Sequence, residues 1–255
     1  MIPAMKEYTK RVVRVIGPSL VRNRPIDAWP GWLGRTLGVK VPQALAPKAQ
    51  PDPTGAANIN ILCALIERAR HLDGDIADCG VYLGGSTVGM ALYLRQHSIA
   101  KTIYGFDSFE GFDAESAAKD MTFGGVENED RHLHGFNGTS IDVVQNKLKR
   151  FHLANVLLVK GFFNRSLPEF AASHDLSQLK FCLVHLDVNL YDSYKDCLKF
   201  FYPLLVKGGI ILLDEYNDPP WPGCNKAVDE FLTGLPEKLE MIERDNYQKW
   251  YVMKS

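Results

Sequence analysis

Short apolar runs alternate with helix-like segments along the chain from residue 75 onward. The apolar runs are continuous rather than alternating, which is typical of strands buried on both faces of a parallel sheet. The segments between them carry apolar residues at spacings of three and four, which favours helices. We therefore expect strands at 75–81, 101–107, 155–161, 180–187 and 210–215, and helices at 86–97, 139–151, 166–173, around 194–201 and near 224–233.

The last part of the chain breaks this alternation. Residues 238–244 and 248–254 form two consecutive predicted strands around Asp245-Asn246, which indicates an antiparallel pair at the sheet edge. Lys207-Gly208-Gly209 predicts a turn that leads into the strand at 210–215. The whole pattern predicts an α/β fold with a doubly wound, mostly parallel sheet.

Two segments stand outside this pattern. In residues 1–74 the sequence predicts a short basic amphipathic helix at 4–16, an irregular proline-rich stretch at 24–55 and a helix at 56–72. We expect this N-terminal extension to be a lid, a substrate-contacting arm or a contact with a sister subunit. The polar segment 110–138 follows the second strand at the sheet edge where ligands bind, which predicts a functional or mobile insertion.

Composition and charge narrow the class of protein. With 255 residues, 46% of them hydrophobic and 23% charged, the chain resembles a globular protein rather than a disordered one. A formal net charge of −1 argues against a dedicated nucleic-acid binder. No apolar run approaches the ~18 residues that a membrane span needs. Basic residues such as Lys6 and Arg14 interrupt the N-terminus before a signal-peptide core can form.

Five cysteines are scattered along the sequence, at Cys63, Cys79, Cys182, Cys197 and Cys224. None of them forms a Cys-x-x-Cys pair, so neither a zinc site nor a disulfide framework is indicated. We therefore expect reduced, mostly buried thiols and a cytoplasmic location.

A glycine-rich turn follows the first predicted strand, in the run DCGVYLGGS from Asp78 to Ser86. Glycines let the chain turn sharply from strand to helix and let a ligand approach the main chain. The helix that begins near Ser86 offers free N–H groups and the positive end of its dipole. The dinucleotide fingerprint Gly-x-Gly-x-x-Gly is absent. A Gly-x-x-x-Gly turn by itself also occurs where no ligand binds.

Asp107 ends the second predicted strand, in the run IYGFDSF. An acidic side chain at this place can accept hydrogen bonds from both ribose hydroxyls of a nucleoside, as in NAD sites. The alternative interpretation is an aspartate that caps a helix or stabilises a turn. Together with the glycine turn, Asp107 predicts a nucleoside-binding site.

Three acidic residues follow the fourth and fifth predicted strands: Asp187 in LVHLDVN, and Asp214-Glu215 in IILLDEYND. If these strands are neighbours, about 4.8 Å apart, the carboxylates converge at one corner of the sheet. Like charges at such distances repel and raise each other's pKa. A hard divalent cation resolves the conflict, and Mg²⁺ is the natural candidate.

The three motifs together resemble the macrocin O-methyltransferase family. The resemblance is carried by DIADCGVYLGGS, GFDSFEGF and VHLDVNLYDSYKDCLKFFYPLLVKGGIILLDEY, and it covers about residues 75–255. It implies a Rossmann-like class I methyltransferase domain with a seven-stranded sheet, and S-adenosylmethionine and Mg²⁺ as cofactors. It also implies methylation of a sugar hydroxyl, on a glycosylated natural product or a polysaccharide precursor, by a homo-oligomer that is a dimer or higher.

The resemblance implies a set of cofactor-binding residues. Those at the methionine end of the cofactor would be Asp78, Gly80, Gly84, Gly85 and Ser86. Those around the ribose would be Asp107, Ser108 and Phe109, and those beside the adenine Gly161 and Phe162.

The resemblance also implies that Asp187, Asp214 and Glu215 hold the metal. Two positions depart from the family's pattern. Glu215 replaces the second member of an Asp-Asp pair, and Asp187-Val188-Asn189 replaces Asp-Gly-Asp. A longer glutamate can still reach a metal ion. The two departures therefore affect whether all three residues coordinate the ion.

Methylation of a sugar hydroxyl needs a general base, because the hydroxyl is a poor nucleophile until it loses its proton. Asp187 is the first candidate, since it would contact both the metal and the hydroxyl, and a bound Mg²⁺ would lower the hydroxyl pKa. His185 lies two residues earlier and is a second candidate. His132 and His134 in the 110–138 segment are further candidates.

Three other functions compete with this interpretation. A catechol-type O-methyltransferase would share the metal corner but take a flat aromatic acceptor. An NAD-binding oxidoreductase is disfavoured because the dinucleotide fingerprint is absent. A non-catalytic nucleoside-binding module would have no need of the acidic cluster.

Overall fold

The computed structural model describes residues 53–124 and 136–255. The predicted helix at 4–16 lies outside the described residues, as do His132, His134 and all but the last three residues of the proline-rich stretch. The first described element is helix α4 (Pro53–Ala69), which the sequence predicted at 56–72.

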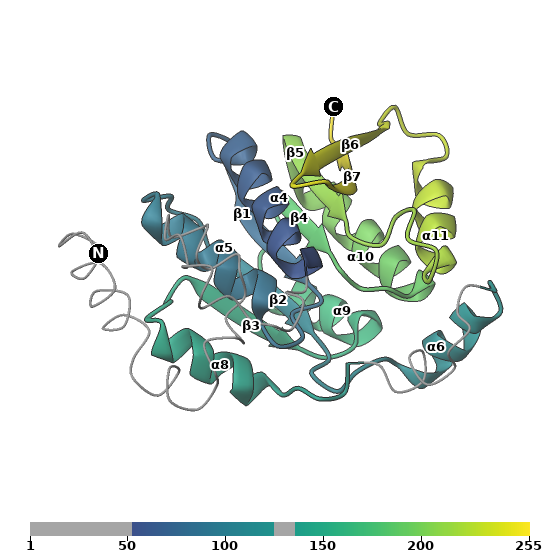
Figure 1. Cartoon of the computed structure of the whole chain (residues 1–255), viewed down its shortest axis with the longest axis horizontal. Helices are drawn as coiled ribbons and strands as arrows, with labels where there is room; N and C mark the ends of the chain where they lie inside the picture. Colours follow the sequence, from purple (N-terminus) through teal and green to yellow (C-terminus); the bar gives the residue numbers. More distant parts are fainter. Residues whose placement is uncertain (1–52, 125–135) are drawn as a thin grey trace, which may run out of the picture.

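Seven strands form one sheet in the order β3-β2-β1-β4-β5-β7-β6 (Figure 1). Strands β1 to β5 are parallel, and β7 pairs antiparallel with both β5 and β6. The strands are β1 (Asp75–Cys79), β2 (Ile103–Asp107), β3 (Val156–Lys160), β4 (Phe181–Leu186), β5 (Leu205–Leu213), β6 (Leu239–Arg244) and β7 (Tyr247–Met253). The predicted fold class, with its antiparallel pair at one edge, is therefore confirmed.

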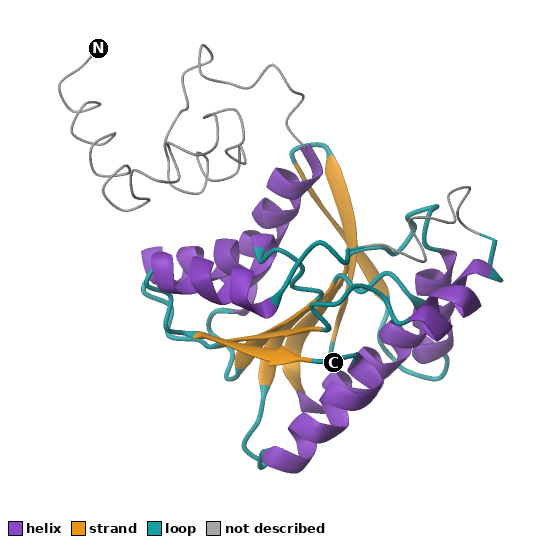
Figure 2. Ribbon diagram, turned by 90° about the horizontal axis from the view of Figure 1, so that it is seen from below, coloured by secondary structure: helices purple, strands orange, loops and turns teal. Residues whose placement is uncertain are grey.

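Helices cover both faces of the sheet, which makes the fold doubly wound (Figures 1 and 2). Besides α4, they are α5 (Gly85–Gln96), α6 (Ala114–Met121), α8 (Ile141–Arg150), α9 (Phe163–Ser173), α10 (Tyr191–Leu204) and α11 (Pro222–Leu232). One apolar core lies between the sheet and α4, α5 and α8, and a second between the sheet and α9, α10 and α11. All six residues of β4 are buried, as its continuous apolar run predicted.

The strand order reverses at β1, which lies between β2 on one side and β4 on the other. In open parallel sheets, ligands bind at such a switch point, beyond the carboxyl ends of the strands. The ends of β1 and β4, at Cys79 and Leu186, therefore mark where a site is expected.

The start of β5 differs from the prediction. Lys207-Gly208-Gly209 lies inside the strand rather than in a turn before it. Phe181 pairs with Leu205 but Leu183 pairs with Ile210, so the residues between them bulge out of the pairing. Two backbone hydrogen bonds between this bulge and Lys254, of 2.8 and 2.9 Å, keep it in the sheet.

Helix α6 was not predicted within the 110–138 segment. Asp113 caps its first turn by accepting a hydrogen bond of 2.9 Å from the Ser116 N–H. At its other end, Asp120 accepts a hydrogen bond of 3.0 Å from the Tyr191 N–H, which ties α6 to the start of α10. The helix spans only two turns, so its apolar repeat was too short to recognise.

All five cysteines are buried and free of disulfide bonds, as predicted. Within the described ranges, no helix has both the length and the apolar character needed to cross a membrane.

Candidate functional site

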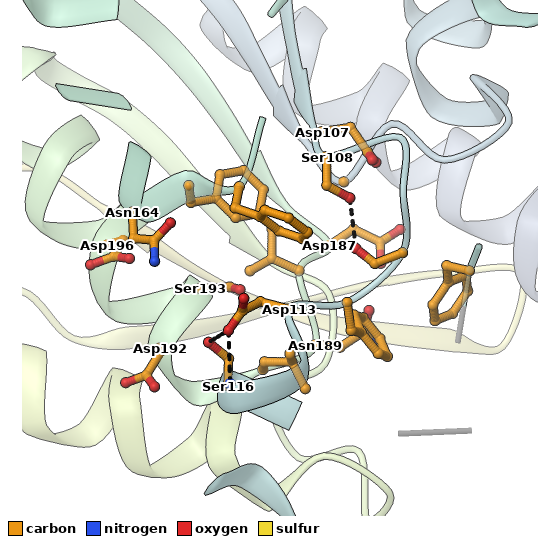
Figure 3. A pocket seen from close by; sticks show the side chains of 18 of the residues that line it. Asp107, Ser108, Asp113, Ser116, Asn164, Asp187, Asn189, Asp192, Ser193 and Asp196 are labelled. Atoms are coloured by element: carbon orange, nitrogen blue, oxygen red, sulfur yellow. Dashed lines mark hydrogen bonds between the residues drawn. The ribbon is translucent and has the colours of Figure 1, made fainter. Parts of the chain in front are cut away.

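A cavity of about 450 Å³ opens beyond the carboxyl ends of β1, β2 and β4 (Figure 3). Gly80, Asp107 and Asp187 line it, each just after or at the end of one of these strands. Of the residues predicted for the cofactor, Ser108 and Phe162 also line it. The cavity thus lies at the switch point of the sheet and brings together three of the predicted motifs.

The turn after β1 requires glycine at two positions. Gly80 has a φ of +94°, and a Cβ there would lie 1.8 Å from the carbonyl oxygen of Asp187. Gly84 has a φ of +80° and precedes the first residue of α5. Gly85 and Ser86 form the start of α5, so the positive end of this helix lies directly beyond the turn.

Both carboxylate oxygens of Asp107 accept backbone hydrogen bonds. The Tyr82 N–H donates to one oxygen at 2.8 Å, and the Phe109 N–H donates to the other at 2.6 Å. Burial raises the pKa of Asp107, while these two hydrogen bonds act in the opposite direction. The carboxylate is therefore held in one orientation at the cavity wall, with further lone pairs for a ligand.

The other residues predicted for the ribose and the adenine lie in the turns that follow β2 and β3. The Ser108 hydroxyl donates to the Gly111 carbonyl at 2.6 Å, and the Gly161 N–H donates to the Asp107 carbonyl at 2.9 Å. Phe162 precedes α9 and lines the cavity. Phe109 is buried and does not line it.

Four ionisable side chains form a row across four neighbouring strands, which we call the buried charge row: Asp78 on β1, His185 on β4, Asp214 after β5 and Lys249 on β7. Asp78, His185 and Lys249 are buried, and the side chain of Asp214 is 14% exposed. Asp78 is opposite His185 in the strand register, and its carboxylate lies 2.8 Å from His185 Nδ1. His185 Nε2 lies 3.5 Å from Asp214 Oδ1, and Lys249 Nζ lies 2.7 Å from Asp214 Oδ2. Negative and positive groups alternate along the row.

The row shifts the pKa of its members in opposite directions. Burial alone would lower the pKa of His185, but the hydrogen bonds and charges of Asp214 and Asp78 raise it to about 10. Burial alone would raise the pKa of Asp214, but the charge of Lys249, together with His185, lowers it to about 2. These shifts favour the protonated form of His185 and the ionised form of Asp214.

Asp78 links the row to the glycine turn. One of its oxygens accepts hydrogen bonds from the Ser86 hydroxyl at 2.9 Å and the Thr87 hydroxyl at 2.5 Å. The other oxygen contacts His185. Both oxygens of Asp78 therefore have protein partners, and the side chain does not line the cavity. Neither Asp78 nor His185 lines the cavity. Their contacts connect the start of α5 to β4 beneath the cavity.

Asp187 and Glu215, the other two predicted metal ligands, have different environments. Asp187 lines the cavity, and its pKa is raised to about 6 by burial and by the charge of Asp214. Glu215 is buried behind it and accepts a hydrogen bond from the Tyr194 hydroxyl. Burial and the charges of Asp187 and Asp214 raise the pKa of Glu215 well above its usual value.

Among the described residues, one group could present several ligand atoms to a metal. His185, Asp187 and Asp214 each bring one such atom within 4.8 Å of the others. The predicted convergence of Asp187 and Asp214 is therefore real, and Glu215 is outside this group. Both oxygens of Asp214 already have protein partners, however, because Asn58 on α4 donates to Oδ1 at 2.7 Å and Lys249 holds Oδ2.

The far side of the cavity was not predicted from the sequence. It is formed by α6 with the turn before it, by the start of α9, and by the start of α10 with the turn before it. Figure 3 shows the labelled polar residues of these segments around the cavity. The polar residues that line the cavity here include Asp113, Ser116, Lys119, Asn164, Asn189, Asp192, Ser193 and Asp196. Recognising them required the packing of α6 against α10, which no local pattern indicated.

Comparison with known proteins agrees with this geometry. The family model Macrocin-O-methyltransferase (TylF) matches residues 36–251. The 8-demethyl-8-(2,3-dimethoxy-alpha-L-rhamnosyl)-tetracenomycin-C 4'-O-methyltransferase of Streptomyces olivaceus is 29% identical over 241 residues, 88% of this chain and 84% of that protein. The mycinamicin III 3''-O-methyltransferase of Micromonospora griseorubida is 25% identical over 202 residues, 74% of each chain.

Among solved structures, the calicheamicin methyltransferase CalS11 has the same fold. Its TM-score is 0.65 at 22% identity, and the match covers 99% of this chain and 93% of that one.

Replacing Gly80 with alanine is expected to destabilise the protein by roughly 2–4 kcal/mol, because the new Cβ would clash with the backbone of Asp187 at a positive φ. Gly85→Ala is the matched control, since a Cβ there meets nothing within 4 Å. Its stability should stay within about 1 kcal/mol of wild type. Urea unfolding measures both, and equal midpoints would contradict this account of the turn.

Asp78→Asn is expected to destabilise the protein by roughly 3 kcal/mol, because it removes the charge of the buried carboxylate that lies 2.8 Å from His185 Nδ1. Asp73→Asn is the control, because Asp73 forms an exposed ion pair of 2.8 Å with Lys180. This exposed pair should change stability little. Urea unfolding measures the stability of the two variants. If Asp78→Asn were as stable as wild type, the buried charge row would not support the fold.

Proposed function

Because this chain belongs to the macrocin O-methyltransferase family and is an S-adenosylmethionine-dependent O-methyltransferase, we propose that it methylates a sugar hydroxyl of a glycosylated small molecule. The observation that carries the proposal is that Asp107 and Asp187 line one cavity. Asp107 offers a fixed carboxylate to a ribose, and Asp187 offers a proton acceptor to the group that reacts. The cofactor and the acceptor would therefore bind in the same cavity.

The residues present fit the cofactor. The glycine turn lets a ligand approach the backbone, and a Cβ at Gly80 would collide with the chain. Asp107 would accept hydrogen bonds from the ribose hydroxyls, with Ser108 beside it and Phe162 against the adenine. Gly84, Gly85 and Ser86 would lie near the methionine end.

The acceptor would lie on the side of the cavity formed by α6 and α10. This side presents carboxylates, amides and hydroxyls, which match the many hydroxyl groups of a sugar ring. The two curated relatives are named for O-methylation of a rhamnosyl tetracenomycin and of mycinamicin III. These names favour a glycosylated natural product over a polysaccharide precursor.

Asp187 would act as the general base. Its carboxylate lines the cavity, and a pKa near 6 suits a group that must be ionised at neutral pH yet accept a proton. When bound, the cofactor would supply the electrophilic methyl group that the acceptor oxygen takes up. Asp187 takes the hydroxyl proton as the new oxygen–carbon bond forms.

His185 has a positioning role in this proposal rather than the catalytic one considered from the sequence. It is fully buried between Asp78 and Asp214 and does not line the cavity. It lies between Asp78 and Asp214, and the charge of Asp214 adds to burial in raising the pKa of Asp187.

Mg²⁺ at Asp187, Asp214 and Glu215 stays a prediction of the family resemblance. Carboxylates are suitable donors, and the ion would lower the pKa of a coordinated hydroxyl. Yet Asp214 has a protein partner on each oxygen, and Glu215 accepts a hydrogen bond from Tyr194. The other oxygen of Glu215 is buried without a hydrogen-bond partner, however, so these side chains would still offer oxygen ligands to an ion beside Asp187.

Three other predictions stay open to experiment. We propose that residues 1–74 contribute contacts to the acceptor or to a sister subunit, and that 75–255 hold the catalytic machinery with the 110–138 segment at the cavity. Assembly as a homo-oligomer and a cytoplasmic location are part of the same proposal.

S-Adenosylhomocysteine is expected to stabilise the protein, by about 2.7 kcal/mol at a hundred times its dissociation constant. The midpoint of thermal unfolding should rise by several degrees, and NAD should have no effect. Asp107→Asn should weaken the binding about tenfold or more, because it removes a charged hydrogen-bond acceptor. Asp175→Asn, at an exposed turn, is the control. A shift with NAD alone would contradict the cofactor assignment.

Asp187→Asn is expected to lower methyl transfer by roughly 10²–10⁴-fold, because the amide cannot accept the hydroxyl proton. Binding of S-adenosylhomocysteine should survive in this variant. The assay supplies labelled S-adenosylmethionine with a panel of neutral glycosides and catechols, and mass spectrometry locates the new methyl group. Methylation of catechols alone would favour the catechol-type alternative, and full activity of the variant would remove Asp187 from the mechanism.

A further inference from the structure

One polar side chain in the cavity wall is buried and has no partner in the described parts of the protein. Asn189 lines the cavity (Figure 3), and only 7% of its surface is exposed. Across residues 53–124 and 136–255, no hydrogen bond reaches its side-chain amide. A buried amide normally has a hydrogen-bond partner. The cavity is therefore the place where this amide can find one.

Two carboxylates on the same side of the cavity differ from Asn189 in this respect. Asp113 caps α6, because it accepts hydrogen bonds of 2.9 Å from both the N–H and the hydroxyl of Ser116. Asp192 joins α10 to α6, because it accepts a hydrogen bond of 2.6 Å from the Lys119 ammonium. These side chains serve the fold, whereas the contacts of the described residues give the Asn189 amide no such task.

The backbone places Asn189 close to Asp187. Asn189 is the central residue of a tight turn between β4 and α10, in which the Leu190 N–H donates to the Val188 carbonyl at 2.6 Å. Its φ is +56°, which asparagine tolerates better than most residues. Val188 and Leu190 belong to the apolar core, so Asn189 is a polar side chain in an apolar stretch of the wall. Two residues separate it from Asp187, which keeps their Cα atoms within about 7 Å.

The chemistry of the amide indicates what it would bind. It offers an N–H donor and a carbonyl acceptor without a charge, and a hydroxyl group likewise donates and accepts. In the proposed function the turns after β1, β2 and β3 hold the cofactor. Asn189 follows β4 instead, on the side formed by α6 and α10, so its partner would belong to the acceptor.

We infer that the Asn189 amide binds a second hydroxyl of the acceptor, adjacent to the one that reacts, and so determines which hydroxyl is methylated. The inference rests on the proposed function, in which Asp187 takes the proton of the reacting hydroxyl. An acceptor without the second hydroxyl would leave the amide buried and unpaired. A site of this kind rejects such an analogue.

A comparison of matched acceptors and matched variants tests the inference. The acceptor is the compound of the glycoside and catechol panel that is methylated. Its analogues lack one neighbouring hydroxyl at a time, as a deoxyglycoside does, or as phenol does beside catechol. Asn189→Gly removes the amide and suits the positive φ. Asn217→Gly is the matched control, because Asn217 has a φ of +64°, is exposed and does not line the cavity.

Wild type and Asn217→Gly should prefer the acceptor to one of its analogues by about tenfold or more in kcat/KM. Asn189→Gly should lose a similar factor on the acceptor and treat the acceptor and that analogue alike. A residue needed only for the geometry of the turn would not change this preference. All three proteins should bind S-adenosylhomocysteine equally well in the thermal-shift assay, which also shows that they are folded.

Three outcomes would overturn the inference. They are wild-type enzyme that methylates every analogue as efficiently as the acceptor, Asn189→Gly that keeps the wild-type preference, and Asn189→Gly that binds S-adenosylhomocysteine more weakly. The last outcome would assign the amide to the cofactor. The wild-type comparison decides the question even if Asn189→Gly does not fold. Methylation of catechols alone would contradict the sugar proposal, yet catechol against phenol would still test Asn189.

Discussion

The alternation of buried charges across β1, β4, β5 and β7 is the constraint on which the rest of the site depends. Isolated charges in a protein interior are costly, so each member of the buried charge row requires its neighbour. Asp78 needs His185, His185 needs Asp214, and Asp214 needs Lys249. The row thus links the ends of four strands, and the cavity opens beyond two of them, β1 and β4.

The row also separates two tasks that carboxylates perform in this molecule. Asp78 and Asp214 have their oxygens occupied by protein groups and act as fixed charges. Asp107 and Asp187 lie at the cavity wall, where a ligand can reach them. The same residue type therefore serves as a fixed charge or as a ligand-facing group according to whether its side chain lines the cavity.

Much of this arrangement was predictable because it follows from strand pattern. Continuous apolar runs gave the parallel strands, and Asp107, Asp187 and Asp214 stand where those runs end. Lys249 was missed because a single lysine in a short edge-proximal strand resembles a surface residue. Only the pairing of β7 with β5 places it beside Asp214, 35 residues earlier. Helix α6 and the hydrogen bond between Glu215 and Tyr194 likewise depend on tertiary packing.

The order of the row along the chain has a consequence for biosynthesis. Lys249 leaves the ribosome 35 residues after Asp214, a delay of roughly two to seven seconds at ~5–20 residues per second. During that interval the parallel strands can assemble while Asp214 still lacks its ammonium partner. The nascent domain should therefore keep this corner hydrated and loosely packed until β7 pairs with β5. Pairing of β7 with β5 then brings the Lys249 ammonium to Asp214 and excludes water from this corner of the site.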